Sequence, residues 1–278
     1  MVKQTKVIAI ELDQVLACTI QAMTQWHRET YGKALSISES TTAVYTLFGT
    51  HEEANVKMRK FYDSSNFQNL KPINDEALEV LKYIKKQGHL LVIITWRPQF
   101  IAEQTRKFVD RHYPGLFNSI YFCNMGLTMA EQLDYVCKSK SIMCQEVGVD
   151  LLIDDSLQSC LECAALGIDI LLFDFHGKYS YNHIKEARRK RTLTSTSKQL
   201  YHRTQAQSLP SNVKRISDWK GIKTCFPKPT SPLRVCHFPN EDDEDDLTLI
   251  EDEEDNKVHI YSKRRYADAW PDSTMVFV

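Results

Sequence analysis

The sequence predicts an α/β protein with a parallel β-sheet, helices on both faces of the sheet, and a small helical insert near the start. Two observations support this prediction. Several short runs are apolar throughout, which is typical of strands buried on both faces. Segments with helical spacing separate these runs, as connections between parallel strands require.

Predicted strands and helices alternate over residues 1–182. A strand is expected where an apolar run is rich in β-branched residues, and a helix where apolar residues recur every three or four positions. Glycines and a Pro-Gly pair mark the ends of the helices. The expected strands are Val7–Ile10, His89–Thr95, Ser119–Phe122, Asp150–Ile153 and Asp169–Phe173. The expected helices are Glu76–Gln87, Phe100–His112, Lys138–Glu146 and Leu157–Leu166.

Residues 17–75 interrupt this alternation. Apolar residues at helical spacing between Ile20 and Tyr31, closed by Gly32, predict one helix, and a second is expected around Glu52–Tyr62. An insert directly after the first strand would lie over the strand ends. We therefore expect these residues to form a helical cap over a site at that edge of the sheet.

The formal net charge of −1 hides an asymmetry along the chain. Residues 1–182 carry 18 basic and 21 acidic side chains, residues 183–234 carry 13 and 2, and residues 235–278 carry 4 and 13. The net charges are −3, +11 and −9, which sum to −1. We expect a core over 1–182, a basic polar linker over 183–212 and a largely disordered acidic tail over 227–278. Between the last two, residues 213–222 should dock on the core as a closing element.

Cysteine and apolar patterns bear on the compartment. The C-x-x-C of Cys160 and Cys163 has no second pair at zinc spacing and no redox context, so we expect reduced thiols on a helix surface. No run approaches the ~18 apolar residues of a membrane span, and the first apolar run is too short for a signal peptide. We expect a soluble cytoplasmic protein, and the basic run 188–191 leaves nuclear import open.

Polar side chains follow three of the predicted strands. Glu11 and Asp13 follow the first, Thr95 ends the second, and Asp154-Asp155 follow the fourth. Ligands of parallel sheets bind beyond the carboxyl ends of the strands, so we expect these residues to meet there. Structural alternatives stay open, because Thr95 is also a good strand residue and Asp also caps helices.

The order of these motifs, with Lys140 between the second and the third, resembles the haloacid dehalogenase-like (HAD) superfamily of phosphohydrolases. Further short motifs resemble its 5′(3′)-deoxyribonucleotidase-like family, which has a small helical cap. These motifs are Thr30–Gly32, Phe61–Ser64 with Phe67, Thr95–Pro98, Ile153–Ser156, Leu161–Cys163, Leu172-Phe173 and Tyr181-Asn182. The resemblance covers roughly residues 5–182, with residues 213–222 as the closing element.

The resemblance implies Mg²⁺-dependent phosphate transfer. The acid at position 11 would attack phosphorus, form an acyl phosphate and bind the metal. Asp13 would protonate the leaving oxygen, activate water and give the metal its backbone carbonyl. Asp154 would be a further metal ligand, and Asp155 would support it from outside.

The same resemblance implies how substrate is held. Thr95, neighbouring backbone N–H groups and Lys140 would bind the phosphoryl oxygens. Lys138 is the alternative to Lys140. Trp96 would contact the rest of the substrate, unless it only packs beneath the cap.

One residue departs from the family, because Glu11 stands where the family has Asp. The extra methylene moves the carboxylate roughly 1.5 Å from its place relative to the backbone. An error of ~1 Å can slow in-line attack on the order of 10²-fold, whereas metal binding tolerates a flexible ligand better. Two functions stay open. The first is a slow phosphatase for a nucleoside monophosphate or similar small phosphomonoester; the second is a non-catalytic HAD-like protein that binds phosphorylated ligands or protein partners.

The acidic segment 241–255 is a candidate partner site. Its apolar centre, Leu247–Ile250, resembles a SUMO-interaction motif and has the form of a strand that adds to a partner's sheet edge. The alternatives are a solvated acidic tail, or a tail that screens the basic residues 185–203. We expect no membrane partner and no nucleic-acid partner.

Overall fold

The computed structural model describes residues 5–33, 35, 48, 50–73, 75–179, 182 and 209–227. The chain divides into two units, and all of these residues except Pro227 belong to the first. Most of the predicted linker, including the basic stretch 185–203, and the tail beyond Pro227 lie outside the described residues. The candidate partner segment 241–255 and the basic run 188–191 lie outside them as well.

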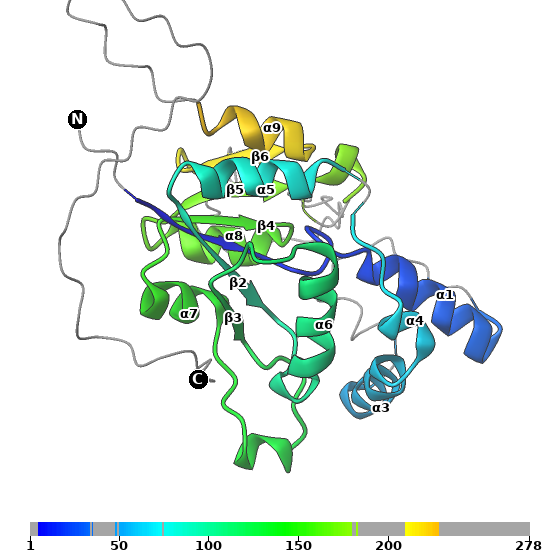
Figure 1. The fold of residues 1–278 in the computed structure, drawn as a ribbon. Helices are drawn as coiled ribbons and strands as arrows, with labels where there is room; N and C mark the ends of the chain where they lie inside the picture. Colours follow the sequence, from blue (N-terminus) through cyan, green and yellow to red (C-terminus); the bar gives the residue numbers. More distant parts are fainter. Residues whose placement is uncertain are drawn as a thin grey trace, which may run out of the picture. The chain divides into compact units, whose positions relative to one another are not determined.

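Six parallel strands form one sheet in the order β3-β2-β1-β4-β5-β6 (Figure 1). The predicted parallel sheet is confirmed, and β1, whose end carries the first motif, lies at its centre between β2 and β4. The strands are β1 (Val7–Ile10), β2 (Leu90–Thr95), β3 (Ser119–Phe122), β4 (Leu151–Asp154), β5 (Asp169–Phe173) and β6 (Val213–Ile216).

Helices cover both faces of the sheet. On one face α5 (Ala77–Lys86), α6 (Ala102–His112) and α9 (Trp219–Thr224) pack on side chains such as Ile8 and Ile10 of β1. On the other face α7 (Lys140–Val147) and α8 (Leu157–Ala164) pack on a second cluster that contains the intervening Ala9. The period of two along β1 thus sends successive side chains into opposite layers. The described part of the chain also has the 3₁₀ turns η1 (Gln99–Ile101), η2 (Glu131–Leu133) and η3 (Phe175–Gly177) between these elements.

Three helices of the insert lie beyond the end of β1 (Figure 1). They are α1 (Thr19–Tyr31), α3 (His51–Tyr62) and α4 (Ser65–Gln68). A capping box begins α3, in which the Thr50 hydroxyl accepts from the Glu53 N–H and the Glu53 carboxylate accepts from the Thr50 N–H. The helices pack through aromatic rings, with the rings of Phe61 and Phe67 at a centroid distance of 5.3 Å.

Residues 213–222, which the sequence predicts as a closing element, form β6 and most of α9. β6 extends the sheet beside β5, and the indole of Trp219 at the start of α9 is fully buried. The Trp219 Nε1–H donates to the Val15 carbonyl at 3.2 Å, directly behind the turn that follows β1. The closing element therefore stabilises the backbone that carries the first motif.

Some expectations need correction. Cys160 and Cys163 lie on the face of α8 that packs against the sheet and are fully buried, so the predicted surface position of the C-x-x-C is wrong. α7 begins at Lys140 rather than Lys138, because the Ser139 hydroxyl caps it by accepting from the Ile142 N–H. α8 ends at Ala164 rather than Leu166, since the chain turns before the left-handed Gly167.

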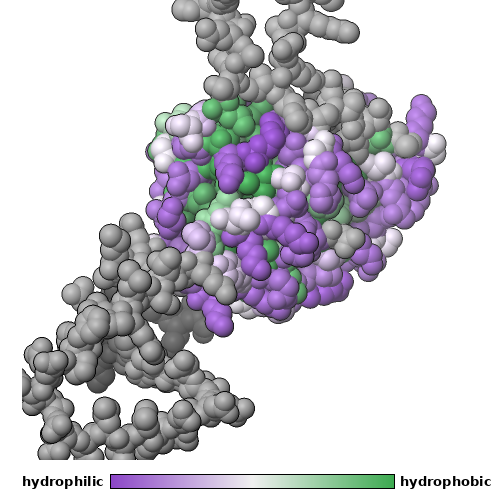
Figure 2. All heavy atoms as spheres, turned by 90° about the horizontal axis from the view of Figure 1, so that it is seen from above, coloured by the Kyte–Doolittle hydropathy of each residue, from purple (hydrophilic) through white to green (hydrophobic). Residues whose placement is uncertain are grey.

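The outer surface is mixed in polarity. Figure 2 shows the molecule from above relative to Figure 1. On this face the described side chains are mostly hydrophilic, with hydrophobic patches between them. Over the described ranges, no helix has both the length and the apolar character that a membrane crossing requires.

Candidate active site

The sheet order brings the predicted motifs together. Thr95 ends β2, Glu11 follows β1, and Asp154 ends β4, and these three strands are neighbours. The Glu11 N–H donates to the Ile153 carbonyl at 2.9 Å, which extends the pairing of β1 with β4 to the motif itself. All three side chains are nearly inaccessible to solvent.

Glu11 is the hub of the site. Its Oε1 accepts from the N–H groups of Leu12 at 2.7 Å and Asp13 at 3.2 Å, and from the Thr95 hydroxyl at 2.8 Å. Its Oε2 is paired with the ammonium of Lys140. The N–H groups of Leu16 and Ala17 donate to the Leu12 carbonyl and so close the turn after β1. This turn holds the two backbone donors, the N–H groups of Leu12 and Asp13, in place.

Lys140 contacts two carboxylates at once. It is the first residue of α7, its side chain is fully buried, and its ammonium pairs with both Glu11 and Asp154. The other oxygen of Asp154 accepts from the Ser156 N–H at 2.7 Å, so Asp154 also orders the start of α8. The alternative, Lys138, pairs instead with Glu146 in a partly exposed position and is not brought to the site.

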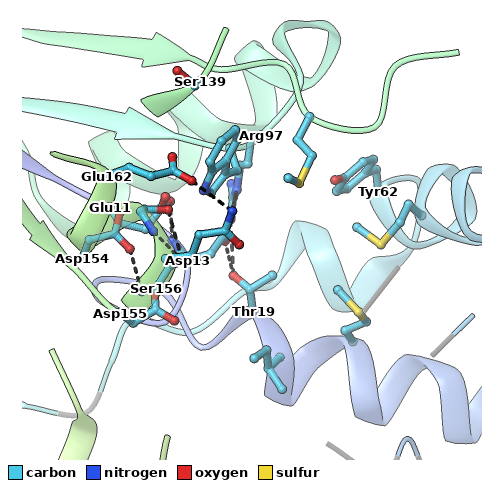
Figure 3. A pocket seen from close by; sticks show the side chains of 17 residues that line it. Glu11, Asp13, Thr19, Tyr62, Arg97, Ser139, Asp154, Asp155, Ser156 and Glu162 are labelled. Carbon is cyan, nitrogen blue, oxygen red and sulfur yellow. Dashed lines mark hydrogen bonds and ion pairs between the residues drawn. The ribbon is translucent and has the colours of Figure 1, made fainter. Parts of the chain in front are cut away.

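Asp13 is held separately from this cluster. Arg97 grips its carboxylate with Nη2 at 2.7 Å from Oδ1 and Nε at 3.1 Å from Oδ2, and the Thr19 hydroxyl donates to Oδ1 (Figure 3). Arg97 itself is almost fully buried and also donates to the Thr105 hydroxyl at 3.2 Å. The guanidinium lies over the Phe67 ring, 5.0 Å from its centroid, so it links the site to the cap.

Arg97 and Thr19 are site residues that the motif reasoning did not assign. Arg97 stands two positions after Thr95 in the stretch Thr95–Pro98. A basic residue this close to the end of a motif strand is the sequence signal that could have identified it. Thr19 carries no such signal, because only the fold places the start of α1 against Asp13.

A pocket of about 350 Å³ opens above the cluster. Glu11, Asp13, Asp154 and Asp155 line its polar end, and Glu162 of α8 adds a further carboxylate (Figure 3). Methionines and aromatic rings from the cap and the core line the rest, namely Met23, Met58, Tyr62, Trp96 and Met125. The volume lies at the lower end of those that hold small molecules, so the pocket suits one small ligand.

Trp96 and Asp155 lie at the site that the sequence predicts. The Trp96 ring is partly exposed to the pocket and has the Lys140 ammonium 5.5 Å from its centroid. Asp155 is buried and lines the same pocket. Every predicted site residue therefore lies in or beneath this pocket.

The electrostatics of the cluster show an excess of negative charge. Burial raises the pKa of Glu11, and although the Lys140 ammonium acts against this, Asp154 and Asp13 raise that pKa further. Burial by itself would lower the pKa of Lys140, but Asp154 and Glu11 outweigh it and hold that pKa well above its ordinary value. Lys140 is thus a permanent ammonium among more carboxylates than it can neutralise.

The donor set fits a hard divalent cation. Glu11 and Asp154 direct carboxylates at the same point, the Lys140 ammonium, and oxygen ligands are those that Mg²⁺ prefers. Within the described ranges, no three His, Cys, Asp or Glu side chains converge as a metal cluster. A divalent cation held by these two carboxylates would need water or substrate oxygens for the rest of its shell.

Comparison with known proteins places the chain in a family. Residues 5–207 match the family described as 5′ nucleotidase, deoxy (pyrimidine), cytosolic type C protein. No curated protein matches the chain significantly.

Three bacterial proteins are among the solved structures to which the chain is similar. A predicted phosphatase from Clostridium acetobutylicum is 12% identical and has a TM-score of 0.46, with 62% of this chain and 85% of that one covered. A predicted phosphoglycolate phosphatase from Haemophilus somnus is 16% identical, with a TM-score of 0.45 and coverages of 66% and 90%. A haloacid dehalogenase-like hydrolase from Streptococcus pneumoniae is 14% identical, with a TM-score of 0.42 and coverages of 61% and 84%.

The family match covers well over half of the chain, and four residues of the motifs that resemble the HAD superfamily, Glu11, Thr95, Lys140 and Asp154, lie together at the carboxyl ends of the strands. The parallel sheet with its helical cap is the fold expected of a HAD-like protein. The chain belongs to the 5′ nucleotidase, deoxy (pyrimidine), cytosolic type C family of HAD-like phosphohydrolases.

Proposed function

We propose that the protein is a Mg²⁺-dependent phosphomonoesterase that acts on a nucleoside monophosphate or a similar small phosphomonoester, at a rate lowered by Glu11. The observation that carries this proposal is the single buried cluster in which Glu11, Thr95, Lys140 and Asp154 contact one another at the floor of a small pocket. Carboxylate, hydroxyl and ammonium groups in this arrangement provide a nucleophile, phosphate donors and metal ligands together.

The reaction would proceed in two balanced steps. An oxygen of Glu11 bonds to phosphorus while the bond from phosphorus to the leaving oxygen breaks, and Asp13 gives that oxygen its proton. Water then attacks the phosphorus of the acyl phosphate, Asp13 takes the proton of the water, and inorganic phosphate leaves with Glu11 regenerated. Mg²⁺ held by Glu11, Asp154 and the Asp13 carbonyl would offset the charge of the phosphate.

The exposure of the carboxylates supports this division of roles. The side chain of Asp13 is 24% exposed, whereas those of Glu11 and Asp154 are 4% and 0% exposed. Asp13 is thus the acid that can reach both the leaving group and water. Arg97 and Thr19 concentrate their contacts on Oδ1, so Oδ2, which within the described part of the chain accepts from Arg97 Nε alone, is the oxygen that would exchange the proton.

The pocket wall supports a substrate with a flat apolar part. Trp96, Tyr62 and the methionines offer ring and thioether surfaces on which a base can stack, and the volume of about 350 Å³ suits one nucleotide. We propose a nucleotide as the substrate because the family that the chain matches is named for nucleotidases. We also propose that the protein acts in the cytoplasm or the nucleus.

An activity panel tests the proposal. The native protein is assayed with an aryl phosphate and with nucleoside monophosphates, with and without Mg²⁺, beside Glu11→Asp and Asp13→Asn. Mg²⁺-dependent turnover by the native protein that Asp13→Asn lacks is the expected result, and equal turnover by Asp13→Asn would show a contaminating phosphatase. If only Glu11→Asp turns over, the native chain is not the proposed enzyme.

A second candidate is a non-catalytic protein that binds phosphorylated ligands or protein partners. The observation that favours it is Glu11 itself, since a longer side chain that keeps metal and lysine contacts need not reach phosphorus. Binding of a nucleoside monophosphate without its hydrolysis, in both the native protein and Glu11→Asp, would favour this candidate.

A further inference from the structure

The environment of Glu11 Oε1 matches that of a phosphate oxygen. Three donors converge on this one atom, the N–H groups of Leu12 and Asp13 and the hydroxyl of Thr95, at 2.7, 3.2 and 2.8 Å. A carboxylate oxygen next to its own strand end would normally accept one or two such bonds. Here the side chain folds back toward the backbone that follows it and accepts from two donors at the end of β1 and one at the end of β2.

These donors are the groups that a phosphoryl group needs. Backbone N–H groups at a strand end and an adjacent hydroxyl bind tetrahedral oxyanions because they lie fixed in a buried site and cost no reorganisation. Lys140, the ammonium next to them, is also engaged by Glu11, through Oε2. One side chain therefore engages the two N–H groups, the hydroxyl and the ammonium that could otherwise bind a phosphoryl group at the floor of the pocket.

The length of Glu makes this occupation attainable. A side chain one methylene shorter ends roughly 1.5 Å nearer its own backbone. From there it could still accept from the N–H groups of Leu12 and Asp13, but it would draw away from the Thr95 hydroxyl and the Lys140 ammonium, which lie on β2 and α7. The carboxylate thus reaches the Thr95 hydroxyl and the Lys140 ammonium because position 11 is Glu.

We propose that Glu11 is an internal occupant of its own phosphate site, so that in the free protein its carboxylate holds the positions of phosphoryl oxygens and a phosphate binds only by displacing it. The inference describes the free state of the proposed active site and rests on the proposed function for the identity of the ligand. It accounts for slow turnover by a competition for donors, in addition to the misplacement of the nucleophile.

Phosphate binding to the full chain tests this inference without any turnover. Isothermal titration with inorganic phosphate, with and without Mg²⁺, compares the native protein with Glu11→Asp, which keeps the charge but withdraws the carboxylate. We expect Glu11→Asp to bind phosphate at least about tenfold more tightly, which corresponds to about 1.4 kcal/mol. Glu11→Ala removes the carboxylate and frees all of these donors. It should also bind phosphate more tightly than the native protein.

Glu162→Ala is the matched control. It removes a carboxylate from the same pocket but frees none of the three donors, so its affinity should change by less than about fivefold, as for a screened charge. Unfolding curves of each variant, recorded in the same buffer, identify any variant that is not folded.

Three results would overturn the inference. They are native affinity equal to that of Glu11→Asp, a gain in Glu162→Ala as large as in Glu11→Asp, and absence of phosphate binding in folded Glu11→Asp and Glu11→Ala alike. Because the readout is binding, a native protein without turnover would refute the proposed function and leave this comparison intact. Equal affinities together with native turnover would do the reverse.

Discussion

Replacement of Lys140 by Met removes the cation that holds the buried cluster together. The ammonium is fully buried and pairs with both Glu11 and Asp154, whose side chains are 4% and 0% exposed. Without it, two nearly buried carboxylates face each other with no cation between them. Breaking a buried ion pair from one side costs about 3–5 kcal/mol, because the remaining charge is left uncompensated.

The expected change is large enough to measure easily. In a domain of this size each kcal/mol lowers the melting temperature by about 2–4 °C, so Lys140→Met should melt about 6–20 °C below the native protein. Mg²⁺ should raise the melting temperature of Lys140→Met more than that of the native protein, since a divalent cation can replace the lost charge between the carboxylates.

Lys138→Met is the matched control for this experiment. Lys138 lies two residues earlier, is partly exposed and pairs with Glu146, so its loss should cost less than about 1 kcal/mol. Thermal unfolding of the three proteins, with and without Mg²⁺, gives the comparison. A Lys140→Met protein as stable as the native one, or a Lys138→Met protein as unstable as Lys140→Met, would refute the assignment of Lys140 to the cluster.

Three further predictions follow from the described contacts. Burial raises the pKa of the Cys123 thiol to about 12, whereas Cys137 is exposed, so iodoacetamide with peptide mapping should label Cys137 rapidly and Cys123 only after unfolding; rapid labelling of both would contradict this. The Gly221 N–H donates to Asp218 at 2.6 Å and lowers the pKa of Asp218 in the folded protein. The stability that ionised Asp218 contributes is therefore complete above the ordinary pKa of Asp and is lost as the pH falls through the lowered pKa of the folded state. The stability difference between the native protein and Asp218→Asn, which keeps the cap without titrating, should therefore shrink in acid, and a constant difference would exclude the linkage. Trp219→Ala should lower the free energy of unfolding by about 3–5 kcal/mol in urea titrations and Trp219→Phe by less, whereas equal losses would mean that the indole ring adds no packing.

The sequence predicted the parts of the fold that depend on local pattern. Runs such as Asp169–Phe173 are short and apolar after their first residue, and the structure has a strand with the same bounds. The four motifs were predictable as a set, because the ends of neighbouring parallel strands meet at one edge. Helix ends were less predictable: the cap by Ser139 decides where α7 begins, and no periodicity marks it.

Other features depend on contacts between distant residues. The burial of Cys160 and Cys163 follows from the way α8 faces the sheet, which a lone C-x-x-C does not indicate. The grip of Arg97 on Asp13 joins residues 84 positions apart. The contacts of the Glu11 carboxylate with the phosphate-binding donors depend on its side-chain torsions, which the sequence does not give. The presence of Glu in place of the family's Asp, by contrast, is visible in the sequence.

Trapping of the phosphorylated intermediate tests the central claim most directly. With an aryl phosphate the leaving oxygen is stable without a proton, so Asp13→Asn should still be phosphorylated but should fail to activate water. Mixed with p-nitrophenyl phosphate and Mg²⁺, Asp13→Asn should release one equivalent of nitrophenolate and then stop. Acid quenching, borohydride reduction and peptide mapping should then find the modified residue at Glu11. A phosphoryl group on any other residue, or none on Glu11 in either the native protein or Asp13→Asn, would contradict the assignment of Glu11 as the nucleophile.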